Sequence, residues 1–294
     1  MAIAEDVTIL RTSSSGGRAS RLPLRYALLS YGLMLLALLA MGLPMYWMVA
    51  AAFKENSEIY QIPVTWVPHA PTLENFGRAW RAAPFGRYYL NTIITTALGS
   101  GAEIVLATTS AYAFAFLRFP KKEWFFLLLL AALMVPDQVT ILTNYLTIAR
   151  LGWVDTYQGI IVPGAAVAYG TFLLRQTFLS LPREVLDAAR VDGAGHLRTL
   201  WSVVIPLSRP ALVTFGLISI VAKWNNFLWP LVATNTQEMR VLPIGIYRLL
   251  DQEGTTQWGT VMAGTIFVVL PVLIVFLWAQ KHIVEGIAAG AVKG

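Results

Sequence analysis

Long apolar runs without charge constrain this chain more than any other feature of its sequence. The run from Tyr26 to Phe53 contains no charged residue, and a helix needs about 20 mostly apolar residues to cross a bilayer. Charged residues make up only 13% of the chain, whereas soluble domains carry roughly 25%. We therefore predict lipid-facing helices and exclude a water-soluble globule.

Five further apolar runs follow, so the sequence predicts an all-α, polytopic membrane protein with six transmembrane helices. Together they form one membrane domain over residues 26–281, with a cytoplasmic helix between the fourth and fifth spans. The first run is about twice the usual 7–15 apolar residues of a cleaved signal, which favours an uncleaved span. The other predicted spans are Tyr88–Leu117, Trp124–Ala149, Tyr157–Leu174, Ala211–Ala233 and Trp258–Ala279.

Positive charges predict the orientation of these spans. Six spans place both termini on one side, and 14 of the 22 Lys and Arg residues fall on that side against 7 on the other, with Lys223 inside the fifth span. Because cytoplasmic loops carry the excess of Lys and Arg, we expect a multi-pass membrane protein with both termini in the cytoplasm. Residues 1–25 and 282–294 are then cytoplasmic tails, and the first is expected to be flexible.

A charged insert over residues 180–208 separates the fourth and fifth spans. The sequence predicts a helix over Arg183–Val191 with Pro182 in its first turn, ended by Gly193 in a left-handed conformation. A second short helix is expected from Gly195 or His196 to Val204, stopped by Pro206. Ala188 and Ala189 offer a small-residue face for a close neighbour. This pattern is typical of a docking element, although a solvated interfacial helix has the same composition.

The insert carries a resemblance to a known family. Leu-Pro, Glu184, Asp187-Ala188-Ala189, Asp192-Gly193-Ala194 and Ile205-Pro206-Leu207 resemble the Glu-Ala-Ala loop of ATP-binding-cassette importer permeases. "WNNFLWPL" resembles the fifth-helix signature of that family. "QKHIVEGIAAGAVKG" is similar to the C-terminus of its sugar-transporting branch, the maltose-type second permease, which implies the inner, plasma membrane of a prokaryote. The resemblance implies a coupling helix seated in a cleft of an ATPase subunit, through Glu184, Asp187, Ala188, Ala189, Arg190, Asp192 and Gly193.

One residue departs from the family pattern, since Asp187 stands where the family usually has Glu. Its side chain is one methylene shorter, so any ion pair to the ATPase must shift or pass through water. The resemblance also implies that the loop Thr234–Gln257 reaches into the binding protein, with Pro243–Leu250 helical, although a plain surface loop remains an alternative. It further implies that the C-terminal tail inserts between the ATPase subunits.

The sequence contains no Gly-x-x-x-x-Gly-Lys-Ser/Thr loop, so we expect no cofactor in this chain, with ATP and Mg bound by partner subunits. The expected partners are a second, non-identical permease, two ATPase subunits, an extracytoplasmic substrate-binding protein and membrane lipid, but no nucleic acid. The chain has no Cys, and its three His residues are scattered, which excludes thiol chemistry and gives no metal-ligand spacing. It is interpreted as a transport subunit and not an enzyme.

Polar residues inside the spans are candidates for a translocation path, because ionisable groups are costly in a bilayer. Glu103, Asp137 and Lys223 could line that path or form a buried pair that fixes helix packing, and the amide and aromatic residues could equally serve interhelical contacts. Two other functions stay open: an ion-coupled carrier that uses these three charges, and a scaffold without transport. The candidate path residues are Glu103, Asp137, Asn144, Lys223, Trp224, Asn225 and Asn226.

Overall fold

The protein is described by a computed structural model that covers residues 24–166, 168–250 and 256–291. Over these ranges every regular element is a helix, which confirms the predicted all-α class. The N-terminal tail, apart from its last two residues, lies outside the described residues. The chain divides into two units, one up to Trp47 and one from Met48 onward.

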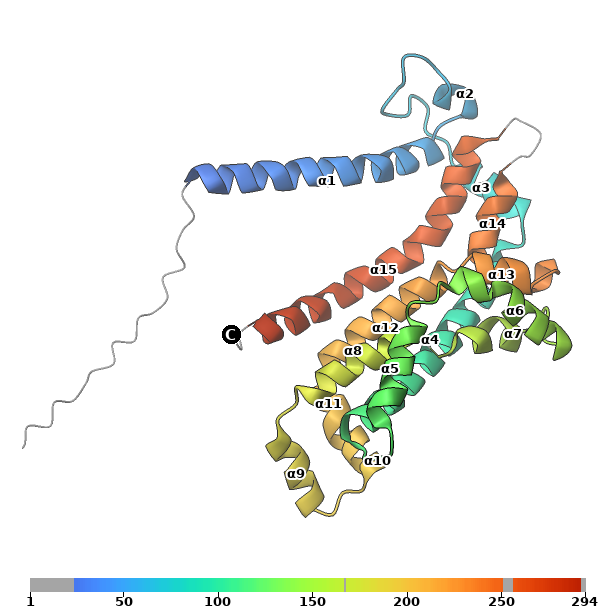
Figure 1. The fold of residues 1–294 in the computed structure, drawn as a ribbon. Helices are drawn as coiled ribbons and strands as arrows, with labels where there is room; N and C mark the ends of the chain where they lie inside the picture. Colours follow the sequence, from blue (N-terminus) through green and yellow to red (C-terminus); the bar gives the residue numbers. More distant parts are fainter. Residues whose placement is uncertain (1–23, 167, 251–255, 292–294) are drawn as a thin grey trace, which may run out of the picture. The chain divides into compact units, whose positions relative to one another are not determined.

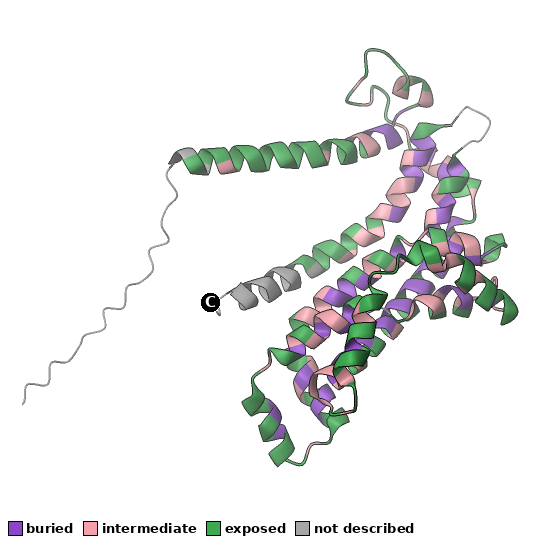
Figure 2. Cartoon of the chain, viewed as in Figure 1, coloured by how far each residue is buried: buried purple, intermediate pink, exposed green. Residues whose placement is uncertain are grey.

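The first unit contains most of helix α1 (Leu24–Ala52), which continues into the second unit at Met48. Its large apolar side chains are exposed along most of the helix (Figure 2). A helix that is apolar on all sides is stable only in an apolar surrounding, and α1 is long enough to cross a membrane. This agrees with the first predicted span.

The second unit is built around α4 (Phe85–Phe116), which packs against α8 (Ala168–Leu179) and α12 (Arg209–Trp224) (Figure 1). Helix α15 (Trp258–Ala291) in turn packs against α12. Two separate apolar clusters lie along α4, one around Phe85 and Tyr88 and the other around Ala111 and Tyr112. The shorter helices are α2 (Asn56–Ile59), α3 (Glu74–Ala82), α7 (Tyr157–Ile161), η1 (Val162–Gly164), η3 (Gln237–Met239) and α14 (Leu242–Leu249).

Three single helices, α1, α4 and α15, are long and apolar enough to span a membrane, and six spans result if each of three bent helix pairs counts as one. The third predicted span is not one continuous helix. That segment is α5 (Lys122–Ala132) followed by α6 (Asp137–Arg150), bent by 97°. Pro136 precedes α6, and proline disfavours the helical conformation of the residue before it, so Val135 cannot continue α5.

The predicted fifth helix is also interrupted. Helix α12 ends at Trp224, and α13 (Leu228–Ala233) begins after a three-residue break. Asn225 closes α12, and its side-chain amide donates to the Val221 carbonyl at 2.9 Å. Asparagine competes with the helix for backbone groups in this way. Helix α15 continues beyond the predicted sixth span, so the segment from residue 282 is helical as far as Ala291.

The charged insert between the fourth and fifth spans partly follows its prediction. Helix α9 (Arg183–Val191) has the predicted bounds, with Pro182 just before its first turn. The second helix runs further than predicted, as α10 (His196–Thr199), the π-helix η2 (Leu200–Val204) and α11 (Ile205–Leu207). Pro206 does not stop it, because the wider π turn shifts the hydrogen-bond register and Pro206 falls in the first turn of α11, where a missing N–H costs little. An 84° bend then leads into α12.

The contact between α8 and α12 depends on Gly170, which yields a prediction. A Cβ atom at this position would lie 2.1 Å from the Phe215 ring. We expect Gly170→Ala to lower the free energy of unfolding by about 1–3 kcal/mol or more through overpacking. Thermal unfolding of the purified chain in detergent measures this change, and Gly170→Ala with Phe215→Leu should recover much of the loss.

Gly101 of α4 provides the matched control, because nothing lies within 4 Å of a Cβ atom there. Gly101→Ala should not destabilise the protein, since alanine is a better helix former than glycine. Equal melting temperatures for the Gly170 and Gly101 variants would contradict the close helix approach.

Candidate functional site

The first candidate surface is the exposed face of α9 in the charged insert. Glu184, Asp187, Ala188 and Val191 are all exposed, and their spacing of three, four and seven residues places them on one side of a helix. Leu186 and Ala189 are buried on the opposite side, with Leu186 in the apolar cluster of α4, α8 and η2. The prediction that Ala188 and Ala189 share a docking face is therefore wrong, since Ala189 packs inward.

Charge and apolar surface alternate on this face. Arg190 donates to the Asp187 carboxylate at 2.9 Å, and both side chains are exposed. Val191 is 88% exposed, and Leu197 and Trp201 of the following helix are also largely exposed. An exposed apolar group edged by charge is unusual for a surface that faces water alone and is typical of a protein contact.

The end of α9 has a defined geometry. Gly193 has φ of +73°, as predicted, and its N–H donates to the Arg190 carbonyl at 3.0 Å. The N–H of Ala194 donates to the Ala189 carbonyl at 2.9 Å. These two bonds form a Schellman motif, with Asp192 at the last half-helical position and Gly193 in the left-handed position after it.

A side-chain contact connects the segment after Gly193 with α4. The Tyr112 hydroxyl of α4 lies 3.3 Å from His196 Nδ1, and the two rings meet edge to face. A groove between α4 and the insert is lined by Tyr112, Leu186, Gly193 and His196 among others. The start of α10 is thus connected to α4 through a side-chain contact.

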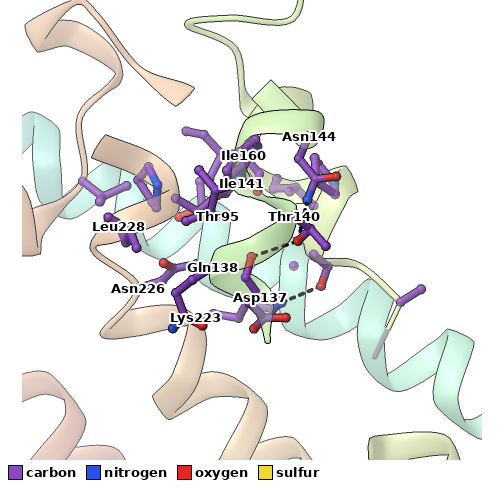
Figure 3. A pocket seen from close by; sticks show the side chains of 18 residues that line it. Thr95, Asp137, Gln138, Thr140, Ile141, Asn144, Ile160, Lys223, Asn226 and Leu228 are labelled. Carbon is purple, nitrogen blue, oxygen red and sulfur yellow. Dashed lines mark hydrogen bonds between the residues drawn. The ribbon is translucent and has the colours of Figure 1, made fainter. Parts of the chain in front are cut away.

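The second candidate site is a polar pocket of about 320 Å³ among α4, α6, α7, η1 and the junction of α12 with α13 (Figure 3). Four predicted path residues line it: Asp137, Asn144, Lys223 and Asn226. Figure 3 shows Asp137, Thr140 and Asn144 along α6, with Lys223, Asn226 and Leu228 on another wall. Asn144 donates to the Thr140 hydroxyl at 3.4 Å, and that hydroxyl donates to the Asp137 carbonyl at 2.9 Å.

The other three predicted path residues do not line the pocket. Glu103 is buried behind it and lies 3.3 Å from Lys223 Nζ, with side-chain exposures of 6% and 20%. Trp224 points to the opposite side of α12 and donates to the Val268 carbonyl of α15 at 2.9 Å. Asn225 caps α12 and is exposed. The Glu103–Lys223 contact is the buried pairing that the sequence left as an alternative.

Lys223 is held from two sides. Its Nζ donates to the Gly164 carbonyl of η1 at 2.6 Å, and Glu103 in turn accepts from the Ser219 hydroxyl at 2.8 Å. A buried ion pair needs such additional hydrogen bonds to offset its desolvation. These contacts join α4, α12 and η1 on one side of the pocket.

The predicted site omitted Thr95 and Thr140, which line the pocket together with Gln138 and Trp229. The Trp229 indole donates to the Ile160 carbonyl at 3.1 Å, which fixes the pocket's α13 wall. A signal for the α4 wall was present in the sequence: Asn91, Thr95, Gly99 and Glu103 recur every four residues, so they share one helix face. None of the described residues forms a cluster of His, Cys, Asp or Glu that could hold a metal.

The outer loops carry a further carboxylate with a structural role. Asp155 has φ of +58°, and its Oδ1 accepts from the backbone N–H groups of Asn235 and Thr236 at 2.7 and 2.9 Å and from the Thr236 hydroxyl at 3.1 Å. Burial raises the pKa of this carboxyl, but the hydrogen bonds from Thr236 and Asn235 together outweigh it and hold the pKa below its usual range. Helix α14, as predicted for Pro243–Leu250, follows this loop.

We expect the Asp155 contact to make stability depend on pH. Because the folded-state pKa is lowered, the stabilisation is present above the unfolded value of about 4 and is lost as the pH falls through the folded-state pKa. Asp155→Asn keeps an acceptor oxygen and tolerates positive φ, so it should remove only the charge, at a cost of about 1 kcal/mol at neutral pH. Thermal unfolding between pH 6 and 3 should show the two proteins converging at low pH. A difference that stays constant over this range would contradict the assignment.

Comparison with known proteins identifies the family to which the chain belongs. Residues 23–288 match the family described as "Binding-protein-dependent transport system inner membrane component". The chain is 34% identical over 262 residues to the sn-glycerol-3-phosphate transport system permease protein UgpE of Yersinia enterocolitica, covering 87% of this chain and 93% of that protein. It is also 34% identical to the probable ABC transporter permease protein YurM of Bacillus subtilis, covering 88% of this chain and 86% of that protein.

Among solved structures, the chain is similar to one from a bacterial ABC transporter involved in the import of the acidic polysaccharide alginate. That match has a TM-score of 0.79 and 24% identity, and it covers 89% of this chain and 98% of the other. It shows the fold alone.

Proposed function

Because the chain belongs to the family of binding-protein-dependent transport system inner membrane components, it is a permease subunit of an ABC importer and not an enzyme, and we propose how its two sites serve import. The face of α9 docks on an ATPase subunit, and the polar pocket is this chain's share of the path for a sugar or sugar-like solute. A second, non-identical permease provides the other half of that path. Both termini lie in the cytoplasm.

The single observation that carries this proposal is the exposed stripe of Glu184, Asp187, Ala188 and Val191 on a helix whose other side is fixed in the core. A docking element must move with the bundle as a rigid body, and the Schellman motif at Gly193 provides the fixed turn. ATP and Mg are bound by the ATPase subunits, whose closure supplies the work. Shifting a two-state bundle from 1:99 to 99:1 takes about 5.5 kcal/mol of differential binding.

The pocket supports the proposed solute class. Asn144, Asn226, Gln138 and Thr140 offer neutral hydrogen-bonding groups, and the Trp229 side chain adds an aromatic wall. Hydroxyl-rich solutes form hydrogen bonds with such groups, and the apolar face of a sugar ring packs against an aromatic side chain. The extracytoplasmic binding protein delivers the solute at the outer loops, including Thr234–Gln257. The side chains of the C-terminal segment from Lys281 lie outside the described residues, and its predicted contact with the ATPase subunits stays a prediction.

The ion-coupled carrier is less well supported than the importer. Of the three charged residues that it requires, Glu103 and Lys223 form an ion pair with each other. Family membership also favours ATP-driven import. The scaffold hypothesis leaves the polar pocket without a role.

Reconstitution tests the proposal. Co-expressed with its second permease and two ATPase subunits, the chain should copurify as one complex whose ATP hydrolysis in liposomes rises several-fold with the loaded binding protein. Uptake by the chain alone under a proton or sodium gradient, without ATP, would instead support the carrier.

A further inference from the structure

The charged residues around the polar pocket support a further inference, which rests on the proposed function. We infer that this chain's part of the path excludes anionic solutes and that Asp137 sets this selectivity. The importer therefore accepts an uncharged, hydroxyl-rich solute, unlike the glycerol phosphate and alginate systems named above. The inference follows from which charges in the pocket are compensated and which are not.

Lys223 is the only cation among the described residues that line the pocket, and its charge is already neutralised. Its Nζ lies 3.3 Å from the Glu103 carboxylate and donates to the Gly164 carbonyl at 2.6 Å. Its aliphatic chain passes within 3.7–3.9 Å of the position of a Cβ atom at Gly99, so the side chain is confined along α4. An anion that approached Lys223 would meet the Glu103 carboxylate beside it.

Asp137, in contrast, presents an uncompensated carboxylate. It is the first residue of α6 and is exposed, and no cation of the described residues lies within ion-pairing distance of its side chain. Its backbone carbonyl accepts from Thr140, but that bond does not involve the carboxylate. The start of a helix contributes roughly half a positive elementary charge, which offsets only part of the Asp137 charge.

The sum of the charges around the pocket is therefore negative. Lys223 and Glu103 cancel, and Asp137 exceeds the partial charge of the α6 terminus. The remaining polar groups are neutral: Thr95, Gln138, Thr140, Asn144 and Asn226. In a partly dehydrated pocket, one unit of charge changes the local concentration of an ion by about tenfold. An uncharged solute is not repelled by the Asp137 carboxylate, and it can still form hydrogen bonds with the neutral polar groups.

The absence of cysteine from the chain allows a direct test. Asn226→Cys places one thiol on the pocket wall in the assembled transporter. Its reaction rates with cationic trimethylammonium-ethyl, neutral hydroxyethyl and anionic sulfonatoethyl methanethiosulfonate are measured at low ionic strength. Intact mass of this subunit reports the modification, and each rate is divided by the rate of the same reagent with 2-mercaptoethanol. Asp137→Asn and Glu103→Gln are added to the Cys variant, with Glu55→Gln in the outer loop as the matched removal of a carboxylate elsewhere.

We expect the normalised anionic rate to be about tenfold below the cationic rate and clearly below the neutral rate. Asp137→Asn should reduce the cation-to-anion ratio at least about threefold, and Glu103→Gln should reduce it further by releasing the Lys223 charge. Glu55→Gln should leave the ratio unchanged. A normalised anionic rate equal to or above the neutral rate, or no response to Asp137→Asn, would overturn the inference.

These rates need no ATP, so the two proposals fail separately. A complex that shows the expected ratios but never couples ATP hydrolysis to the binding protein would contradict the importer proposal alone. A working importer whose pocket favours the anionic reagent would contradict the charge selectivity alone.

Discussion

Gly193→Val is expected to abolish binding-protein-stimulated ATP hydrolysis and uptake while the chain stays in the membrane. Gly193 has φ of +73°, and a left-handed conformation costs an ordinary residue about 1–2 kcal/mol, with a higher cost for a β-branched side chain. Losing this conformation breaks the two hydrogen bonds that end α9, so the exposed stripe can no longer keep a fixed angle to the bundle. ATP hydrolysis of the reconstituted complex, with and without loaded binding protein, measures the loss.

The controls separate backbone conformation from bulk. Nothing lies within 4 Å of a Cβ atom at Gly193, so a side chain there meets no steric obstacle within the chain. Gly193→Asn should therefore retain most of the coupling, because asparagine tolerates the left-handed region, and Gly193→Ala should fall between the two. If the Val and Asn variants coupled equally well, the fixed turn would have no part in transmission.

Glu103→Ala is expected to destabilise the membrane bundle by about 3–5 kcal/mol, because removal of one partner of a buried ion pair leaves the other charge uncompensated. Lys223 would then remain among α4, α12 and η1 with the Gly164 carbonyl as its hydrogen-bond acceptor. Ser219 would also lose its acceptor at 2.8 Å. Denaturant unfolding of the purified chain in detergent gives the change in free energy.

A double-mutant cycle isolates the pair. Glu103→Ala with Lys223→Met should be markedly less destabilised than the sum of the two single variants, since replacing both partners of a buried pair is often close to neutral. Strict additivity of the three free energies would show that the two groups do not interact in the membrane.

The all-helical class and the apolar spans followed from the sequence, because uncharged runs of membrane-spanning length leave few alternatives. The ends of α9 and the left-handed Gly193 were predicted from local chemistry alone, and both are confirmed. The breaks inside the third and fifth spans were missed. Their signals were local, Val135-Pro136 and Asn225-Asn226, but mean hydropathy over a long window averages such short breaks away.

Site residues were predictable only where their chemistry was unusual for a membrane. Glu103 and Lys223 stood out as charges, yet their pairing depends on α4 and α12 lying side by side, which no spacing in the sequence reveals. Thr95 and Thr140 passed unnoticed because threonine is common in membrane helices as a donor to its own backbone. The inward position of Ala189 likewise required the packing of α9 against α8 and η2 to be known.

The most direct measurement of the central claim, that the exposed face of α9 docks on an ATPase, is site-specific cross-linking from that face. Ala188→Cys in this otherwise cysteine-free chain is labelled with a short photoreactive maleimide before the complex is assembled, and Ser180→Cys, exposed just before α9, is the control. The account predicts a strong adduct with the ATPase subunit from position 188 and a weak one or none from position 180. An Ala188→Cys thiol that forms no ATPase adduct, and that reacts with a soluble thiol reagent as fast in the complex as in the isolated chain, would contradict it.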